Sequence, residues 1–127
     1  MKISSMCPWL ALLAPVAMAV MAFSSAAHED CGAQSSQIEM NACFGRDLQR
    51  ADSRLNGAYA KRLDGMRDDP GGARLLRDAE RAWMDFRDKN CAFLAHGEEG
   101  GSVYSTMLAT CRITMTEART KEIQAQN

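Results

Sequence analysis

The chain has 127 residues, of which 24% are charged and 46% hydrophobic, and its formal net charge is −1. This length predicts a single domain. So small a charge argues against a general nucleic-acid binder, because such proteins need a basic face to displace counterions from phosphate. A weakly acidic surface is compatible with a basic protein partner.

The first 27 residues have the order of an export signal. Lys2 is followed by a mostly apolar stretch from Pro8 to Phe23 and then by small residues up to Ala27, as in a secretory signal. A retained membrane anchor is the alternative, but the apolar run is shorter than the roughly 20 residues that span a bilayer. We therefore predict a signal peptide at 1–27 and a helical domain at 28–127, periplasmic or secreted, with no stable membrane anchor.

The periodic part of the mature sequence opens with a capping box, Ser36-Gln37-Ile38-Glu39. Apolar side chains then recur in steps of three or four, which predicts one helix of about 30 residues with a single apolar stripe. The stripe comprises Phe44, Leu48, Ala51, Leu55, Tyr59, Leu63 and Met66.

A Gly-bearing turn at 67–72 precedes a second predicted helix. Asp69 suits its cap, and Pro70 suits its first position because the N–H that proline lacks would be unpaired there. The expected stripe of this helix comprises Leu76, Ala79, Trp83, Phe86, Asn90 and Phe93.

A second Gly-rich turn, at 95–102, precedes a third predicted helix, for which Ser102 is a plausible cap. Its expected face comprises Tyr104, Leu108, Cys111, Met115 and Ala118. Strand signals are nearly absent. The sequence predicts an all-α fold, a small antiparallel bundle of about three helices in which the last closes over two long ones.

Four cysteines remain after removal of the signal: Cys31, Cys43, Cys91 and Cys111. An even count in an exported chain predicts disulfides. Four cysteines allow three pairings, and proximity along the predicted helices favours Cys31 with Cys43 and Cys91 with Cys111. Two such bridges would staple the bundle.

No metal site, cofactor or catalytic site is predicted. The chain has no closely spaced cysteine pair, and His28 and His96 lie in an end segment and a turn. Neither histidine falls on an apolar stripe beside a nucleophile, so the base that nucleophilic catalysis needs is missing. We expect the protein not to be an enzyme.

Aromatic and charged residues are dense between 80 and 91. Trp83 and Phe86 share the stripe of the second helix, which favours core packing. Arg87 and Asp88 flank that stripe, where they form a solvated pair or bond the facing helix. A structural polar network is favoured over catalysis. The residues given this structural role are Asp52, Asn56, Tyr59, Trp83, Phe86, Arg87 and Asp88.

Both Gly-bearing turns carry adjacent acids, Asp68 with Asp69 and Glu98 with Glu99. An exposed turn held by a disulfide-stapled hairpin loses less conformational freedom on meeting a partner. These four acids are therefore the candidate partner-binding residues. The alternative is that each turn is simply solvated.

The chain resembles the lysozyme inhibitor LprI-like N-terminal domain family of bacterial envelopes, in an ordered set of short motifs that spans nearly all of the mature sequence. The resemblance implies an exported helical domain with no cofactor and no established active site, and for some members inhibition of lysozyme. Glu80 is a departure, since Gln is expected there. The matching pieces are Glu39-Met40-Asn41-Ala42-Cys43, Ala51-Asp52, Leu55-Asn56, Tyr59, Arg81-Ala82-Trp83, Phe86-Arg87-Asp88, Cys91, Gly100-Gly101-Ser102, Cys111, Thr116 and Arg119.

The functional hypothesis is an exported protein that binds a protein partner and inhibits a lysozyme-type glycosidase by occluding its cleft. The alternative hypothesis is a periplasmic envelope-stress or assembly factor that binds another protein without inhibiting lysozyme. Shared fold alone does not decide between them, because related folds take different partners.

Overall fold

The computed structural model describes residues 30–126, so the predicted signal peptide lies outside the described residues. The described elements, in chain order, are a short 3-10 helix η1 (Cys31–Ala33), α1 (Gln37–Asp64), α2 (Pro70–Ala95), a second 3-10 helix η2 (His96–Glu98) and α3 (Tyr104–Ala125). Residues 30–126 contain no strand. The predicted all-α fold of three helices is confirmed.

The capping residues set where the first two long helices begin. The Ser36 hydroxyl accepts from the backbone N–H of Glu39 at 3.2 Å, and the Asp69 carboxylate accepts from that of Gly72 at 2.9 Å. Both predicted starts are confirmed. Ser102, however, is not the cap of α3. Val103 occupies that position without a side-chain bond, and the loop itself supplies a backbone bond from Tyr104 to Gly101.

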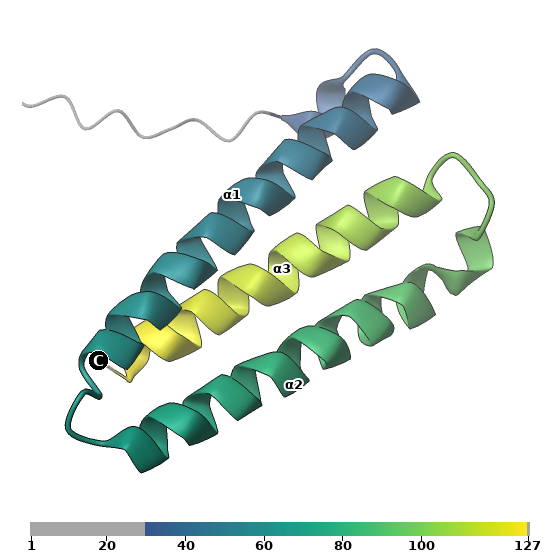
Figure 1. Cartoon of the computed structure of the whole chain (residues 1–127). Helices are drawn as coiled ribbons and strands as arrows, with labels where there is room; N and C mark the ends of the chain where they lie inside the picture. The colour runs from purple at the N-terminus through teal and green to yellow at the C-terminus, as the bar shows by residue number, and fades with distance from the viewer. Residues whose placement is uncertain (1–29, 127) are drawn as a thin grey trace, which may run out of the picture.

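The third helix lies between the other two (Figure 1). α1 and α3 run parallel, and α2 runs antiparallel to both. The expectation that α3 closes over a neighbouring α1–α2 pair is therefore wrong, because α1 packs chiefly on α3. Small side chains allow this close approach, since Ala51 and Ala58 of α1 and Ala109 and Thr116 of α3 are all buried.

The two ends of the bundle are held by different means. Leu55, Ala58 and Ile123 form the buried hydrophobic cluster, with Tyr59 and Trp83 packed against it, toward the end where α3 terminates. The opposite end carries two disulfides, Cys31–Cys43 and Cys91–Cys111, with Cα–Cα distances of 5.5 and 5.6 Å. The favoured pairing is confirmed.

The buried face of α2 differs from the predicted stripe. Phe86 is 57% exposed and Phe93 is 77% exposed, so the prediction that Phe86 packs in the core is wrong. Cys91 must face α3 to reach Cys111, and a residue two positions away points to nearly the opposite side of a helix. Ala79 of the predicted stripe and Ala118 of the α3 face are also exposed. The buried residues of α2 are Ala73, Glu80, Arg87, Cys91 and Ala95.

Among the described helices, none combines the length and the hydropathy of a membrane span.

Candidate functional site

The loop between α2 and α3 contains a type II β-turn at Glu98–Gly101. Glu99 has φ −59° and ψ 128°, and Gly100 has φ 81°. The backbone N–H of Gly101 donates to the carbonyl oxygen of Glu98 at 2.8 Å and closes the turn. A type II turn needs a positive φ at its third residue, which glycine adopts without steric cost. The sequence Glu-Glu-Gly-Gly therefore specifies a defined turn.

Both acids of this turn face solvent. Glu98 and Glu99 are exposed, and the Glu99 carboxylate lies 3.2 Å from Nδ1 of His96. The side chains of that His–Glu pair are 78% and 64% exposed, so the contact lies on the surface. The turn thus presents two carboxylates at the tip of the α2–α3 hairpin.

The base of the turn is rigidly anchored. Ala95, the last residue of α2, is 1% exposed, and Cys91 is fully buried in the disulfide that joins α2 to Cys111 of α3. η2 continues directly from the end of α2 and carries Glu98. A partner that contacts the turn therefore meets a short segment whose two ends are fixed in relation to each other.

The other predicted acidic pair lies at the opposite end of the molecule (Figure 1). Asp68 and Asp69 are both exposed, and the carboxylate of Asp69 caps α2. The structure therefore does not bring Asp68 and Asp69 together with Glu98 and Glu99. The two turns cannot enter one enzyme cleft side by side.

Arg87 joins all three helices. It is 8% exposed, and one of its guanidinium nitrogens donates to Asp52 of α1 at 2.9 Å and to Thr116 of α3 at 2.9 Å. Its Nε donates to Asp88 at 3.1 Å, and Arg112 of α3 ion-pairs with the same carboxylate at 3.1 Å. Asp52, Arg87 and Asp88 thus form one inter-helix network.

Two guanidinium groups lie near the ring of Trp83. Those of Arg87 and Arg119 approach its ring to 5.4 and 5.9 Å from the centroid. Arg119 also donates to the buried Glu80 at 3.0 Å and to Glu122 at 3.1 Å. Burial lowers the pKa of Arg119, but the bonds to Glu122 and Glu80 outweigh burial, so its pKa is raised.

The sequence reasoning missed the burial of Glu80 and its pairing with Arg119. Ala73, Glu80, Arg87 and Cys91 recur at helical spacing around a cysteine that must face its partner helix, so this spacing indicates the inward face of α2 but not the partner of Glu80. Asn56, which was expected to belong to the polar network, is exposed. It lines a shallow depression together with Tyr59, Arg77, Glu80, Arg81 and Met84.

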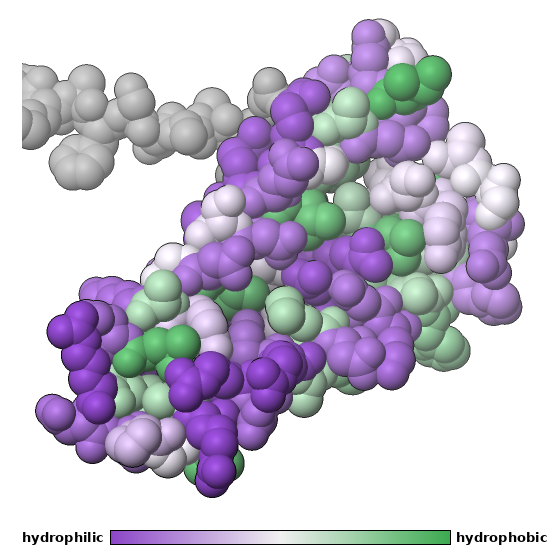
Figure 2. All heavy atoms as spheres, in the orientation of Figure 1, coloured by the Kyte–Doolittle hydropathy of each residue, from purple (hydrophilic) through white to green (hydrophobic). Residues whose placement is uncertain are grey.

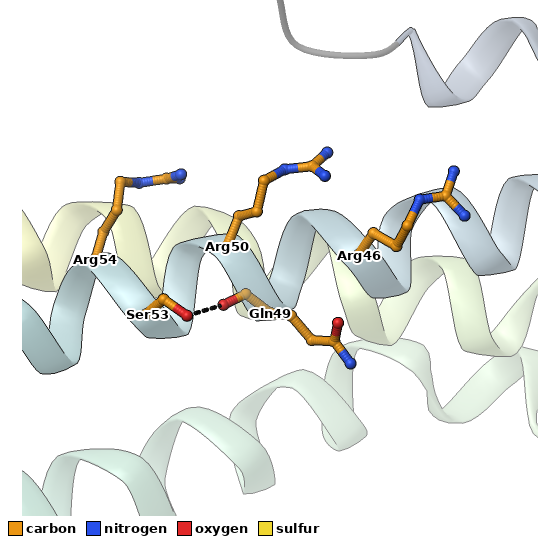
Figure 3. A pocket seen from close by; sticks show the side chains of 5 residues that line it. All are labelled: Arg46, Gln49, Arg50, Ser53 and Arg54. Carbon is orange, nitrogen blue, oxygen red and sulfur yellow. Dashed lines mark hydrogen bonds between the residues drawn. The ribbon is translucent and has the colours of Figure 1, made fainter. Parts of the chain in front are cut away.

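A row of arginines on α1 was also missed. Arg46, Arg50 and Arg54 are spaced four residues apart and extend from one side of the helix (Figure 3). Arg50 ion-pairs with Asp47, and Arg54 donates to Glu117 of α3 at 2.8 Å. The row is therefore partly neutralised, and we assign it to the solvated face of the α1–α3 pair.

Cys31, Cys43 and Asp47 place their ligand atoms within 4.8 Å of one another. The two sulfurs are bonded to each other, and Asp47 pairs with Arg50. Thiolates, and not disulfide sulfurs, are the cysteine ligands of metals. In the oxidised protein this cluster is a buried staple with a neighbouring ion pair.

Comparison with known proteins finds two uncharacterized relatives of similar sequence. The chain is 28% identical over 106 residues to the uncharacterized protein R02472 of Rhizobium meliloti (strain 1021), covering 75% of this chain and 76% of the relative. It is 27% identical over 114 residues to the uncharacterized protein YecT of Escherichia coli (strain K12), covering 76% and 70%. No solved structure matches significantly.

The family model described as lysozyme inhibitor LprI matches residues 28–123. That range includes α1, α2, all but the last two residues of α3, and both disulfides. The disulfides and the family together point to a protein that works outside the cytoplasm. Since the match covers most of the sequence, the chain belongs to the lysozyme inhibitor LprI family.

Proposed function

We propose that this protein is an exported inhibitor that binds a lysozyme-type glycosidase and occludes its cleft with the turn Glu98–Gly101. The observation that carries the proposal is the type II turn held on a disulfide-bonded hairpin. Supporting it, the family is described as one of lysozyme inhibitors. In this proposal the protein acts by binding and has no catalytic step.

The turn suits insertion into a cleft because its conformation is fixed before binding. Ordering a flexible loop costs binding free energy, and a preformed turn avoids most of that cost. Muramidases are commonly basic, so two exposed carboxylates favour the encounter electrostatically. The catalytic carboxylates of such an enzyme repel the turn at close range. Shape complementarity must therefore hold the two glutamates against the cleft walls and away from the catalytic acids.

The first experiment measures hydrolysis of peptidoglycan by a purified lysozyme in the presence of the purified, oxidised protein. We expect saturable inhibition that competes with substrate, because an occupied cleft cannot bind glycan. Undiminished lysozyme activity at a micromolar excess of the protein would contradict the proposal. It would favour the alternative, an envelope factor with another protein partner, which co-purification from periplasm would then identify.

The second experiment locates the contact by charge reversal. The double variant Glu98→Lys, Glu99→Lys should weaken inhibition at least about tenfold, as expected for loss of about 1.4 kcal/mol or more at an interface. The matched control is Asp64→Lys, Asp68→Lys, which makes the same charge change in exposed residues at the opposite end of the bundle. Equal weakening by both double variants would indicate a general charge effect and remove the turn from the contact.

A further inference from the structure

An apolar seam runs along an exposed side of α2. It consists of Leu75, Ala79, Ala82, Phe86 and Phe93, with Lys89 at the one polar position, and is called here the α2 seam. Leu75 is 67% exposed, Phe86 57% and Phe93 77%, and both alanines are exposed. In the space-filling view, hydrophobic atoms are visible at the edge of the molecule where the C-terminal half of α2 lies (Figure 2).

The spacing of the α2 seam is that of a helix–helix contact. Its six positions follow one another in steps of four, three, four, three and four residues, the heptad spacing with which one helix packs along another. The seam extends roughly 27 Å at the rise of an α-helix. Two phenylalanines and a leucine left in water along one continuous line indicate an interaction surface.

We propose that the α2 seam binds the α2 seam of a second copy of this chain, with the two helices antiparallel. The register that centres the pair between Ala82 and Phe86 places Phe86 opposite Ala82 of the second copy. It places Leu75 opposite Phe93 of the second copy. Each Phe86 then packs against an alanine, and each Leu75 packs against a Phe93. These pairs fill the contact without overlap.

Charge complementarity selects the antiparallel arrangement. In the same register Lys89, which pairs with Asp85 of its own helix at 2.8 Å, lies opposite Ala79 of the second copy and next to Asp78 of that copy. A parallel pair would instead place Lys89 against Lys89 of the second copy and Phe86 against Phe86. Like charges in contact destabilise a helix pair. The seam is bordered by both signs of charge, including Asp78, Arg81 and Asp85, which fits a self-complementary partner better than a uniformly basic one.

Sedimentation velocity of the oxidised full mature chain, over a series of concentrations, tests this proposal. We expect a concentration-dependent monomer–dimer equilibrium. Phe86→Glu should weaken dimerisation by about 30-fold or more, the effect of losing an interface residue worth about 2 kcal/mol. Since Phe86 is exposed in the monomer, circular dichroism and thermal unfolding at low concentration should be unchanged.

The matched control is Ile38→Glu, which changes an 82% exposed apolar residue of α1 in the same way and should leave the equilibrium unchanged. Lys89→Asp should weaken the dimer, and adding Asp78→Lys should restore it, which a parallel dimer would not show. A wild-type chain that stays monomeric throughout, or a dimer that Phe86→Glu does not weaken, would overturn the proposal. If the chain is monomeric and Phe86→Glu instead abolishes lysozyme inhibition, the seam belongs to the enzyme contact and self-association is excluded.

Discussion

At the scale of single residues, the buried polar groups do more than the apolar ones to define how the three helices meet. Arg87 reaches Asp52 on α1 and Thr116 on α3, and Trp83 packs beside it. Each of these groups has a specific geometry, whereas small apolar residues tolerate sliding. We infer that the network fixes the register of α2 against the α1–α3 pair.

Replacing Arg87 by Met should lower the free energy of unfolding by about 2 to 4 kcal/mol, because the buried Thr116 hydroxyl loses its donor and three helices lose their common partner. The estimate lies below that for a fully buried pair, since the Asp52 and Asp88 side chains are 41% and 47% exposed and can be solvated. Arg81→Met is the control, because its pair with Asp78 is on the surface and should change stability by less than about 0.5 kcal/mol. Urea unfolding measures both, and equal effects would contradict the role of Arg87.

Residue identity predicted this network only in part. Asp52, Arg87 and Asp88 stand out in the sequence because charged residues flank an apolar periodicity. Glu80 and Arg119 did not, because a carboxylate at helical spacing ordinarily faces water. Only the partner on another helix explains why Glu80 is 6% exposed, and that partner lies 39 residues away in the chain.

At the scale of the elements, the local signals were reliable where one residue bonds its near neighbours. Ser36 and Asp69 cap α1 and α2 as expected, since a cap depends only on residues two or three positions away. The start of α3 was misplaced because a loop backbone bond replaces the side-chain cap. The faces of α2 depend on which helix it meets, so periodicity alone gave the wrong side for Phe86 and Phe93.

The start of α1 should show a pH-dependent contribution from Glu39. Hydrogen bonds from the hydroxyls of Ser35 and Ser36 lower its pKa from the ordinary value of 4.5. A lowered folded-state pKa means that the ionised form stabilises the fold at pH values above 4.5, and that this contribution is lost as the pH falls through the lowered pKa. Glu39→Gln should therefore be less stable than wild type at neutral pH, and the difference should narrow on acidification.

Denaturant unfolding over a pH series checks this expectation for Glu39. In a background with Ser35→Ala and Ser36→Ala, the pH dependence of the Glu39→Gln effect should disappear, because its cause has been removed. If the pH dependence persists in that background, a charged group other than Glu39 paired with these serines causes it.

The Glu98–Gly101 turn can be tested through its one positive φ. Gly100→Ala should cost about 1 kcal/mol, because a side chain disfavours the backbone conformation at φ 81° although no atom lies within 4 Å of the new Cβ. Gly97→Ala is the matched control, since its Cβ also meets nothing within 4 Å and its φ is not positive. Thermal unfolding measures stability, and the inhibition assay measures binding. If both variants inhibit equally well, the conformation of the turn does not determine binding.

At the scale of the whole molecule, the sequence predicted the components better than their arrangement. Length, cysteine parity and periodicity gave an all-α domain with the correct pair of disulfides. The placement of α3 between α1 and α2 was not predictable from short turns, because it depends on the small side chains that let α1 and α3 approach closely. The result is a bundle with a hydrophobic cluster toward one end and covalent staples at the other.

Because both disulfides lie at the end away from the hydrophobic cluster, we predict that they stabilise the same end of the bundle but serve different roles. Removing either one, as Cys31→Ala, Cys43→Ala or as Cys91→Ala, Cys111→Ala, should cost roughly 3 kcal/mol in the chain-entropy model. Hydrogen exchange should then increase first at the start of α1 in the former and at the α2–α3 turn in the latter, while amides around Leu55 and Ile123 stay protected until global unfolding. Only the loss of Cys91–Cys111 should weaken lysozyme inhibition beyond the effect on stability, because that bridge, and not Cys31–Cys43, joins α2 to α3 on either side of the Glu98–Gly101 turn. Equal loss of inhibition in both variants, measured where each is fully folded, would show that the turn needs no covalent anchor.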